Sequence, residues 1–99
     1  TEFTLASGEF FVGTIRNISA GGIFLVTSQA IRTGEYFSFT HRFERELCEV
    51  KAKILRARGI TSGGFGYGCK FVDLLPETEA TIRKFVFAKQ MEKQKKQGR

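Results

Sequence analysis

The stretch Ile15-Arg16-Asn17-Ile18-Ser19-Ala20-Gly21-Gly22-Ile23-Phe24-Leu25 predicts two apolar strands joined by a polar turn that contains two adjacent glycines. Asn17 and Ser19 are two residues apart, so on extended backbone their side chains point to the same face. Gly21 and Gly22 allow positive φ and let a foreign group approach the main chain closely. The stretch therefore predicts a small polar pocket at the end of a strand.

Short strands separated by turn residues are expected on both sides of this stretch. Apolar and polar residues alternate from Cys48 to Ile54, which is the pattern of a half-buried strand. The run Leu55-Arg56-Ala57 breaks the alternation and predicts either a bulge or the end of the strand. The other strands are expected at Glu2 to Ser7, Phe10 to Ile18, Ile23 to Thr27, Glu35 to His41 and Phe65 to Val72, with turns at Gly8-Glu9, Arg42 to Arg45 and Ser62 to Gly64.

The residues after Leu75 predict a helix from Pro76 to about Gln94. Proline suits the first turn of a helix, and Glu77 and Glu79 place negative charge near its start. Its last residues, from Lys95 to Arg99, are expected to fray. The expected apolar face, which packs on the sheet or on a partner, contains Ile82, Phe85, Val86 and Met91 and is widened by Phe87 and Ala88.

These elements predict a mainly β fold, a six-stranded antiparallel β-barrel with a C-terminal α-helix. We expect one domain over residues 1–99, with strands within about 2–72 and the helix at about 76–94. The first residue is Thr rather than Met, so the chain is expected to be a piece of a longer one. No apolar run approaches the ~20 residues of a membrane span, and no signal peptide is recognisable.

The basic charge of the chain is concentrated at its C-terminus. Of the formal net charge of +6, residues 89–99 carry +4, which leaves little for the predicted barrel. A barrel that binds RNA or single-stranded DNA needs aromatic side chains exposed on a basic groove. The candidates are Tyr36, Phe43 and Tyr67 beside Lys51, Lys53, Arg56 and Arg58. Most phenylalanines fall on alternating core positions, so this alternative is the less favoured one.

Catalytic and metal chemistry are not expected. The two cysteines, Cys48 and Cys69, form no CxxC spacing, and His41 is the single histidine. The sequence offers no nucleophile–base pair, no paired carboxylates and no phosphate-binding loop, so we predict that the protein is not an enzyme. Both cysteines lie in predicted strands, where buried free thiols are common, and reduced thiols fit a cytoplasmic protein.

Three motifs carry a resemblance to a known family. The segment Arg16 to Ile23 resembles the (Asp/Asn)-x-Ser-x-x-Gly signature of PilZ domains, which are bacterial receptors for cyclic di-GMP. The segment Gly66 to Val72 is similar to the closing strand of these domains, and Arg83 to Gln90 is similar to PilZ domains of flagellar-brake-type proteins. Taken alone, the same signature is also the pattern of a capped turn.

The resemblance implies that cyclic di-GMP is the ligand and that Asn17, Ser19, Gly21 and Gly22 bind it. In this role Asn17 accepts guanine N–H groups, Ser19 bonds a base or a phosphate, and Gly22 keeps the pocket floor free of a Cβ. In the family an upstream Arg-x-x-x-Arg motif captures the phosphates, and this sequence contains no such motif. We therefore expect weak or undetectable binding by these 99 residues alone, and ligand binding only with an upstream arginine segment.

The resulting functional hypothesis is a cyclic di-GMP-binding regulatory domain in the bacterial cytoplasm, acting in motility or biofilm regulation. It relays the second messenger to a protein partner or a neighbouring domain, and the C-terminal helix is the expected contact. We expect no cofactor, no metal and no nucleic acid partner. The alternative is a degenerate PilZ module that contacts proteins without binding nucleotide.

Overall fold

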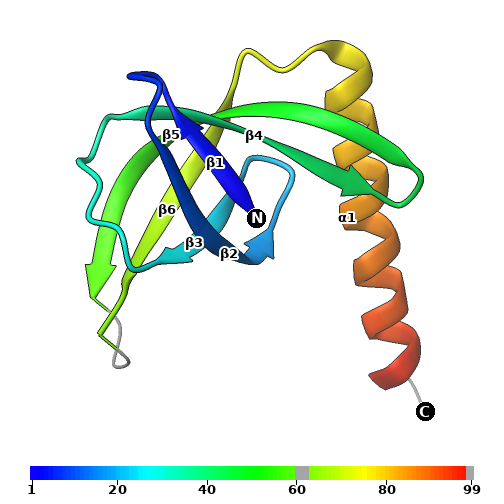
Figure 1. The fold of residues 1–99 in the computed structure, drawn as a ribbon. Coiled ribbons are helices and arrows are strands. Elements are labelled where there is room, and N and C mark those ends of the chain that lie inside the picture. The colour runs from blue at the N-terminus through cyan, green and yellow to red at the C-terminus, as the bar shows by residue number, and fades with distance from the viewer. Residues whose placement is uncertain (60–62, 98–99) are drawn as a thin grey trace.

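The computed structural model describes residues 1–59 and 63–97, with side chains described as far as residue 92. Six strands are followed by one helix (Figure 1). Their bounds are β1 (Glu2–Leu5), β2 (Phe10–Ile18), β3 (Gly22–Thr27), β4 (Tyr36–Phe43), β5 (Glu46–Gly59), β6 (Phe65–Val72) and α1 (Pro76–Gln97).

The strands close into a barrel in the order β1-β2-β3-β6-β5-β4, and every neighbouring pair is antiparallel. The predicted six-stranded antiparallel barrel with a C-terminal helix is therefore confirmed. Alternate residues fill the interior, and aromatic rings dominate one end of it: the rings of Phe3 and Phe11 stack with their centroids 4.9 Å apart. The buried phenylalanines are Phe3, Phe11, Phe37, Phe39, Phe43 and Phe71.

Strand ends differ from the prediction at the two hairpins next to β1 and β4. The first strand stops at Leu5 because Gly8, with φ of 98°, turns the chain and donates its N–H to the Leu5 carbonyl at 2.8 Å. The prediction of a turn at Arg42 to Arg45 is wrong for Arg42 and Phe43, which belong to β4. Phe43 is 1% exposed and packs between His41 and Phe85, so burial of its ring extends the strand.

The β5–β6 hairpin is only partly described. Its strands are β5, which runs on to Gly59, and β6, which has the predicted bounds. Of the turn predicted at Ser62 to Gly64, Ser62 lies outside the described residues, and Gly63 has a φ of 89°. Both cysteines are free, with Cys69 buried and Cys48 half-buried.

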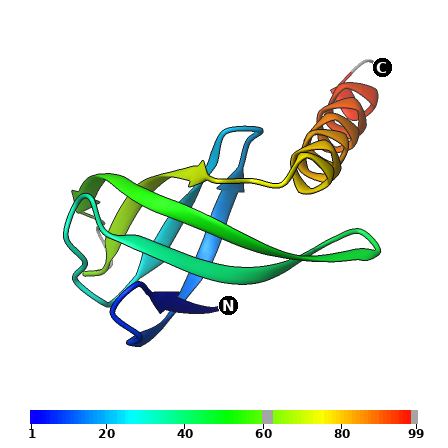
Figure 2. The same cartoon turned by 90° about the horizontal axis from the view of Figure 1, so that it is seen from above.

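Helix α1 lies outside the barrel, beside the end of the β4–β5 hairpin (Figures 1 and 2). It continues to Gln97, past the predicted end at about Gln94, and the fraying expected from Lys95 stays a prediction. Ile82 is fully buried and Phe85 and Val86 are partly buried, whereas Met91 is 47% exposed. The predicted apolar face therefore packs on the barrel only in the first half of the helix.

The side chains of Phe87 and Met91 are exposed to solvent because the second half of α1 extends beyond the barrel (Figure 2). In the part of the chain that the structure describes, no helix combines the length and the apolar character needed to cross a membrane.

Candidate functional site

A β-bulge in β2 sets the orientation of Asn17. Ile15 pairs with Leu25 of β3, and the next pair joins Asn17 to Phe24, so Arg16 is an extra residue. Leu25 is fully buried and side chains directly opposite each other share one face of a sheet, so Ile15 points into the barrel and Asn17 points out. Without the bulge, the alternation of the strand would turn Asn17 toward the interior.

A second bulge, in β5, sets the orientation of two arginines. The buried residue Ile54 pairs with Cys69 of β6, and the next pair joins Arg56 to Gly68, which leaves Leu55 unpaired. Arg56 and Arg58 consequently lie on the outer face of the sheet. The predicted break at Leu55-Arg56-Ala57 is thus a bulge within β5 and not the end of the strand.

The two bulges bring these residues into register across four strands. Asn17, Phe24, Gly68 and Arg56 form one outward-facing row across β2, β3, β6 and β5, which spans ~14 Å at the usual strand spacing. The row crosses a shallow cavity of about 580 Å³, which we call the site cavity. It is lined by Asn17, Ser19, Gly21, Gly22, Ile23, Phe24, Leu55, Arg56, Arg58, Gly68, Cys69 and Lys70.

Two glycines of β6 let large side chains lie flat on the sheet. A Cβ on Gly66 would stand 2.5 Å from Cζ of Phe24, and a Cβ on Gly68 would stand 3.3 Å from Cγ of Arg56. The Phe24 ring and the Arg56 stem therefore occupy the space that these glycines leave free. The guanidinium carbon of Arg58 lies 5.9 Å from the centroid of the Phe24 ring, within cation–π range.

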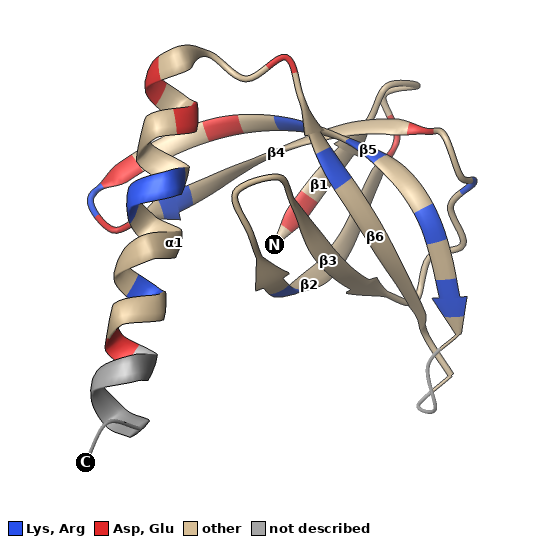
Figure 3. Cartoon of the chain, turned by 180° about the vertical axis from the view of Figure 1, so that it is seen from behind, with Lys and Arg blue, Asp and Glu red and all other residues tan. Residues whose placement is uncertain are grey.

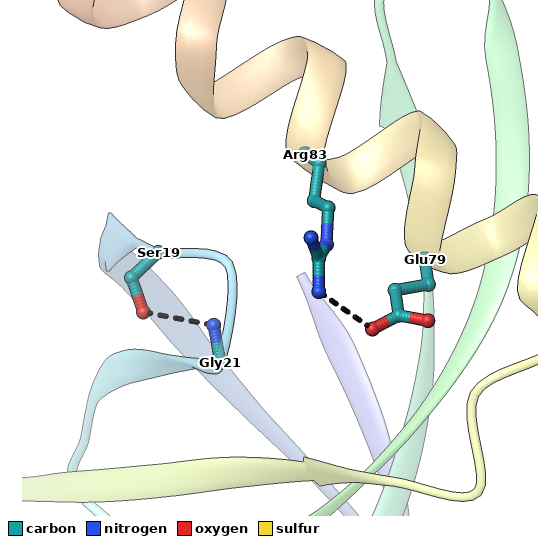
Figure 4. Close-up of polar contacts among 4 residues, drawn as sticks. All are labelled: Ser19, Gly21, Glu79 and Arg83. Atoms are coloured by element: carbon teal, nitrogen blue, oxygen red, sulfur yellow. Dashed lines mark hydrogen bonds and ion pairs between the residues drawn. The ribbon is translucent and has the colours of Figure 1, made fainter.

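The Ser19 hydroxyl organises the turn between β2 and β3 (Figure 4). Its Oγ accepts hydrogen bonds from the backbone N–H groups of Gly21, at 3.3 Å, and Gly22, at 3.2 Å, and donates to the Gly22 carbonyl at 3.3 Å. These bonds form the capped turn that is the local alternative to a ligand contact. The ligand contact of Ser19 stays a prediction.

The two glycines of the turn differ in what surrounds them. Neither has a positive φ, so the turn does not use the left-handed conformation that glycine allows. A Cβ on Gly22 would collide with the carbonyl oxygen of Cys69 in β6, whereas Gly21 has open space around it. Gly22 is thus required by the contact between β3 and β6, and its role on the floor of a ligand pocket stays a prediction.

Cations gather on the outer face of β5 and β6, where Figure 3 shows the blue segments of both strands. Arg56, Arg58 and Lys70 line the site cavity, and none of them makes an ion pair with a described residue. Among the described residues, the ion pair that does form lies on the helix surface, between Arg83 and Glu79 at 3.1 Å (Figure 4). The Asn17 side chain is exposed and forms no hydrogen bond within the described part of the chain.

The family model of the PilZ domain matches residues 2–88. The chain belongs to the PilZ family. A solved structure, the PilZ domain of YcgR from Escherichia coli with c-di-GMP, has the same fold, with a TM-score of 0.66 and 14% sequence identity over 99% of this chain and 88% of that chain. A comparison with curated proteins finds no match.

Among the side chains of this PilZ domain's site cavity that the sequence did not assign to a cyclic di-GMP site are Phe24, Arg56, Arg58 and Lys70, and it named the two arginines only as candidates for a nucleic-acid-binding groove. The signal for the arginines was the broken alternation at Leu55, which shifts the outward-facing positions by one residue. The signal for Phe24 was the Gly66-x-Gly68 spacing, which leaves room for a large neighbour on one face of β6.

A second cavity, of about 610 Å³, separates the end of β2 from α1 in the PilZ domain. It is lined by Ile15, Arg16, Asn17, Ile18, His41, Phe85, Val86, Lys89, Gln90 and Glu92. Asn17 therefore lines both cavities. His41 lines this cavity, and its partial burial lowers its pKa below the ordinary value of 6.5.

The aromatic groove expected of a nucleic-acid-binding barrel is not built from the predicted residues. Phe43 and Tyr67 are each 1% exposed, so neither ring can stack on a nucleic-acid base, and the prediction is wrong for two of its three aromatic residues. Tyr36 is exposed, but the Lys53 ammonium lies 5.5 Å from the centroid of its ring. Among the described residues, moreover, no group of His, Cys, Asp and Glu side chains is placed to hold a metal ion.

Proposed function

We propose that this PilZ domain binds cyclic di-GMP in the site cavity and acts as a receptor rather than an enzyme. The observation that carries the proposal is the gathering of Asn17, Ser19, Gly21 and Gly22 in one cavity with three cations that have no ion-pair partner among the described residues. The YcgR domain, which shares the fold, was solved with this nucleotide.

The residues divide the task by their chemistry. Asn17 offers an unengaged amide oxygen to guanine N–H groups, and Ser19 presents the turn against which the ligand lies. Neutral contacts of this kind contribute roughly 0.5–1.5 kcal/mol each, which is too little to hold a dianion alone. The remaining capture of the phosphates requires cations, the role that the Arg-x-x-x-Arg motif has in the family and for which these 99 residues contain no such motif.

The experiment is a calorimetric titration of the parent protein with cyclic di-GMP, with cyclic di-AMP as the comparison ligand. We expect binding of the guanine nucleotide, weakened about tenfold by Asn17→Ala. The matched control is Gln90→Ala, which removes an exposed amide that lines the second cavity only. Equal affinities of the wild type and Asn17→Ala would contradict the assigned pocket.

We expect the effect of ligand binding to reach α1 through the part of β2 around Asn17, which lines both cavities. Asn17 and its neighbours in β2 face the ligand on one side and α1 on the other, so ordering them changes the surface beside the helix. A protein partner or neighbouring domain reads that surface, in motility or biofilm regulation within the bacterial cytoplasm. Amide hydrogen exchange of α1 that does not change on ligand binding would contradict this relay.

One observation favours a second candidate, the degenerate module that contacts proteins without binding nucleotide. The Ser19 hydroxyl is already engaged on both its donor and its acceptor side within the turn. In that case the parent protein gives no heat on titration, and Asn17→Ala and Ser19→Ala leave partner binding and phenotype unchanged.

A further inference from the structure

We propose that Arg56 and Arg58 of β5, together with Lys70 of β6, form a phosphate-binding half-site within this chain. The inference rests on the proposed function and deepens it, because it names the groups that meet the anionic part of cyclic di-GMP. The resemblance assigns that role to arginines upstream of the barrel, whereas these three cations belong to the barrel itself.

The bulge at Leu55 builds the half-site. Lys53 points outward before the bulge, and the extra residue shifts the alternation so that Arg56 and Arg58 point outward after it. Residues two apart on a strand lie ~7 Å from each other on one face. The two arginines therefore lie side by side on one face, opposite Gly68 and Gly66, where β6 has no side chain to cover them.

Like charges face each other at the edge of this half-site. Lys53 and Lys70 are directly opposite in the β5–β6 ladder, a cross-strand arrangement that destabilises a sheet. Neither has an ion-pair partner among the described residues. An uncompensated cluster of this kind attracts an anion, and guanidinium groups match phosphate oxygens with two parallel hydrogen bonds.

The neighbouring ring adds a flat apolar surface. Phe24 lies between the arginines and Asn17 in the cross-strand row, and Arg58 already lies over its ring. A nucleotide whose phosphates bind the arginines is thereby placed with its base over Phe24 or a guanidinium plane, toward Asn17. The half-site and the motif residues thus face the same ligand from the two ends of one row.

The consequence is that the 99-residue chain binds cyclic di-GMP weakly on its own, with an affinity that falls as salt is added. The test is an NMR chemical-shift titration of this chain with cyclic di-GMP up to millimolar concentration. We expect the double variant Arg56→Gln/Arg58→Gln to bind at least about tenfold more weakly than the wild type. The control is Lys51→Gln, which removes an exposed cation from the same strand outside the site cavity.

The outcomes separate the two proposals. Loss of affinity in both the double arginine variant and Asn17→Ala, with Lys51→Gln unchanged, supports the half-site. If the double variant binds like Lys51→Gln while Asn17→Ala loses binding, the half-site is overturned and the proposed function stands. Absence of any shift in the wild-type chain at millimolar nucleotide also overturns the half-site, and calorimetry on the parent protein then decides the proposed function. Preserved amide dispersion in each variant excludes unfolding as the cause of a loss.

Discussion

Gly22 of β3 lies so close to the backbone of β6 that a Cβ in its place would collide with the carbonyl oxygen of Cys69. The two strands are neighbours in the barrel, and Gly22 opens the ladder that joins them. The last position of the Asn17-x-Ser19-x-x-Gly22 motif is therefore set by the packing of the barrel. If a substitution of Gly22 abolished ligand binding, the first explanation would be disturbed packing of β3 against β6 and not the loss of a direct ligand contact.

The first prediction follows from this contact. Gly22→Ala must push β3 away from β6, and overpacking of this kind costs roughly 1–3 kcal/mol. We expect thermal unfolding to begin markedly earlier, since each kcal/mol shifts the Tm of a domain of this size by roughly 4–8 °C. Gly21→Ala is the matched control, because a Cβ there meets open space and its φ is not positive. Equal Tm values for the two variants would contradict the packing argument.

The second prediction concerns the phenol of Tyr67, which fixes the connection between β3 and β4. Its oxygen accepts a hydrogen bond from the Ile31 N–H at 2.7 Å and donates to the Gln29 carbonyl at 3.2 Å. Tyr67→Phe leaves the Ile31 N–H buried without a partner, so we expect a loss of about 1–3 kcal/mol in the free energy of unfolding. Urea denaturation measures it, with the exposed Tyr36→Phe as a control that changes little.

The third prediction tests how α1 is attached to the barrel. Ile82 is fully buried, so Ile82→Ala should reduce the free energy of unfolding by about 2–5 kcal/mol. Phe87 is 63% exposed, and Phe87→Ala should change it by no more than about 0.5 kcal/mol. Chemical denaturation compares the two variants. A large effect of Phe87→Ala alone would show that the helix packs through its other face.

Alternation together with regularly spaced turn residues was sufficient to predict the barrel, because β1, β4 and β6 bury alternate residues over most of their length. It placed β6 correctly and predicted the irregularity at Leu55. It failed at Phe43, since a single ring between charged residues resembles a turn until Phe85 of the distant helix is known to cover it.

The cations that line the candidate site were harder to predict for a different reason. Counting charge along the chain averages over the faces of a barrel, so the small excess outside the C-terminal segment concealed a cluster on β5 and β6. Arg56 and Lys70 become neighbours of Asn17 only through strand pairing and through two bulges whose direction local sequence does not specify. The motif residues could be proposed from the sequence because they are close together in the chain.

The fourth prediction is a pH dependence of stability that comes from His41. Burial lowers the pKa of this imidazole in the folded state below 6.5. As pH falls through the unfolded-state pKa, the unfolded chain takes up a proton before the folded one does, so stability is lost on acidification until the folded-state pKa is reached.

His41 is the single histidine, so the range between about pH 7 and pH 5.5 isolates its contribution from most carboxyl groups. We expect the free energy of unfolding of the wild type to decrease across this range and that of His41→Gln to change less. Denaturant titrations at the two pH values measure the difference. The same slope in both proteins would mean that the second cavity leaves His41 hydrated, and that the Phe43 ring, whose centroid lies 4.7 Å from that of the imidazole, does not shield it from solvent.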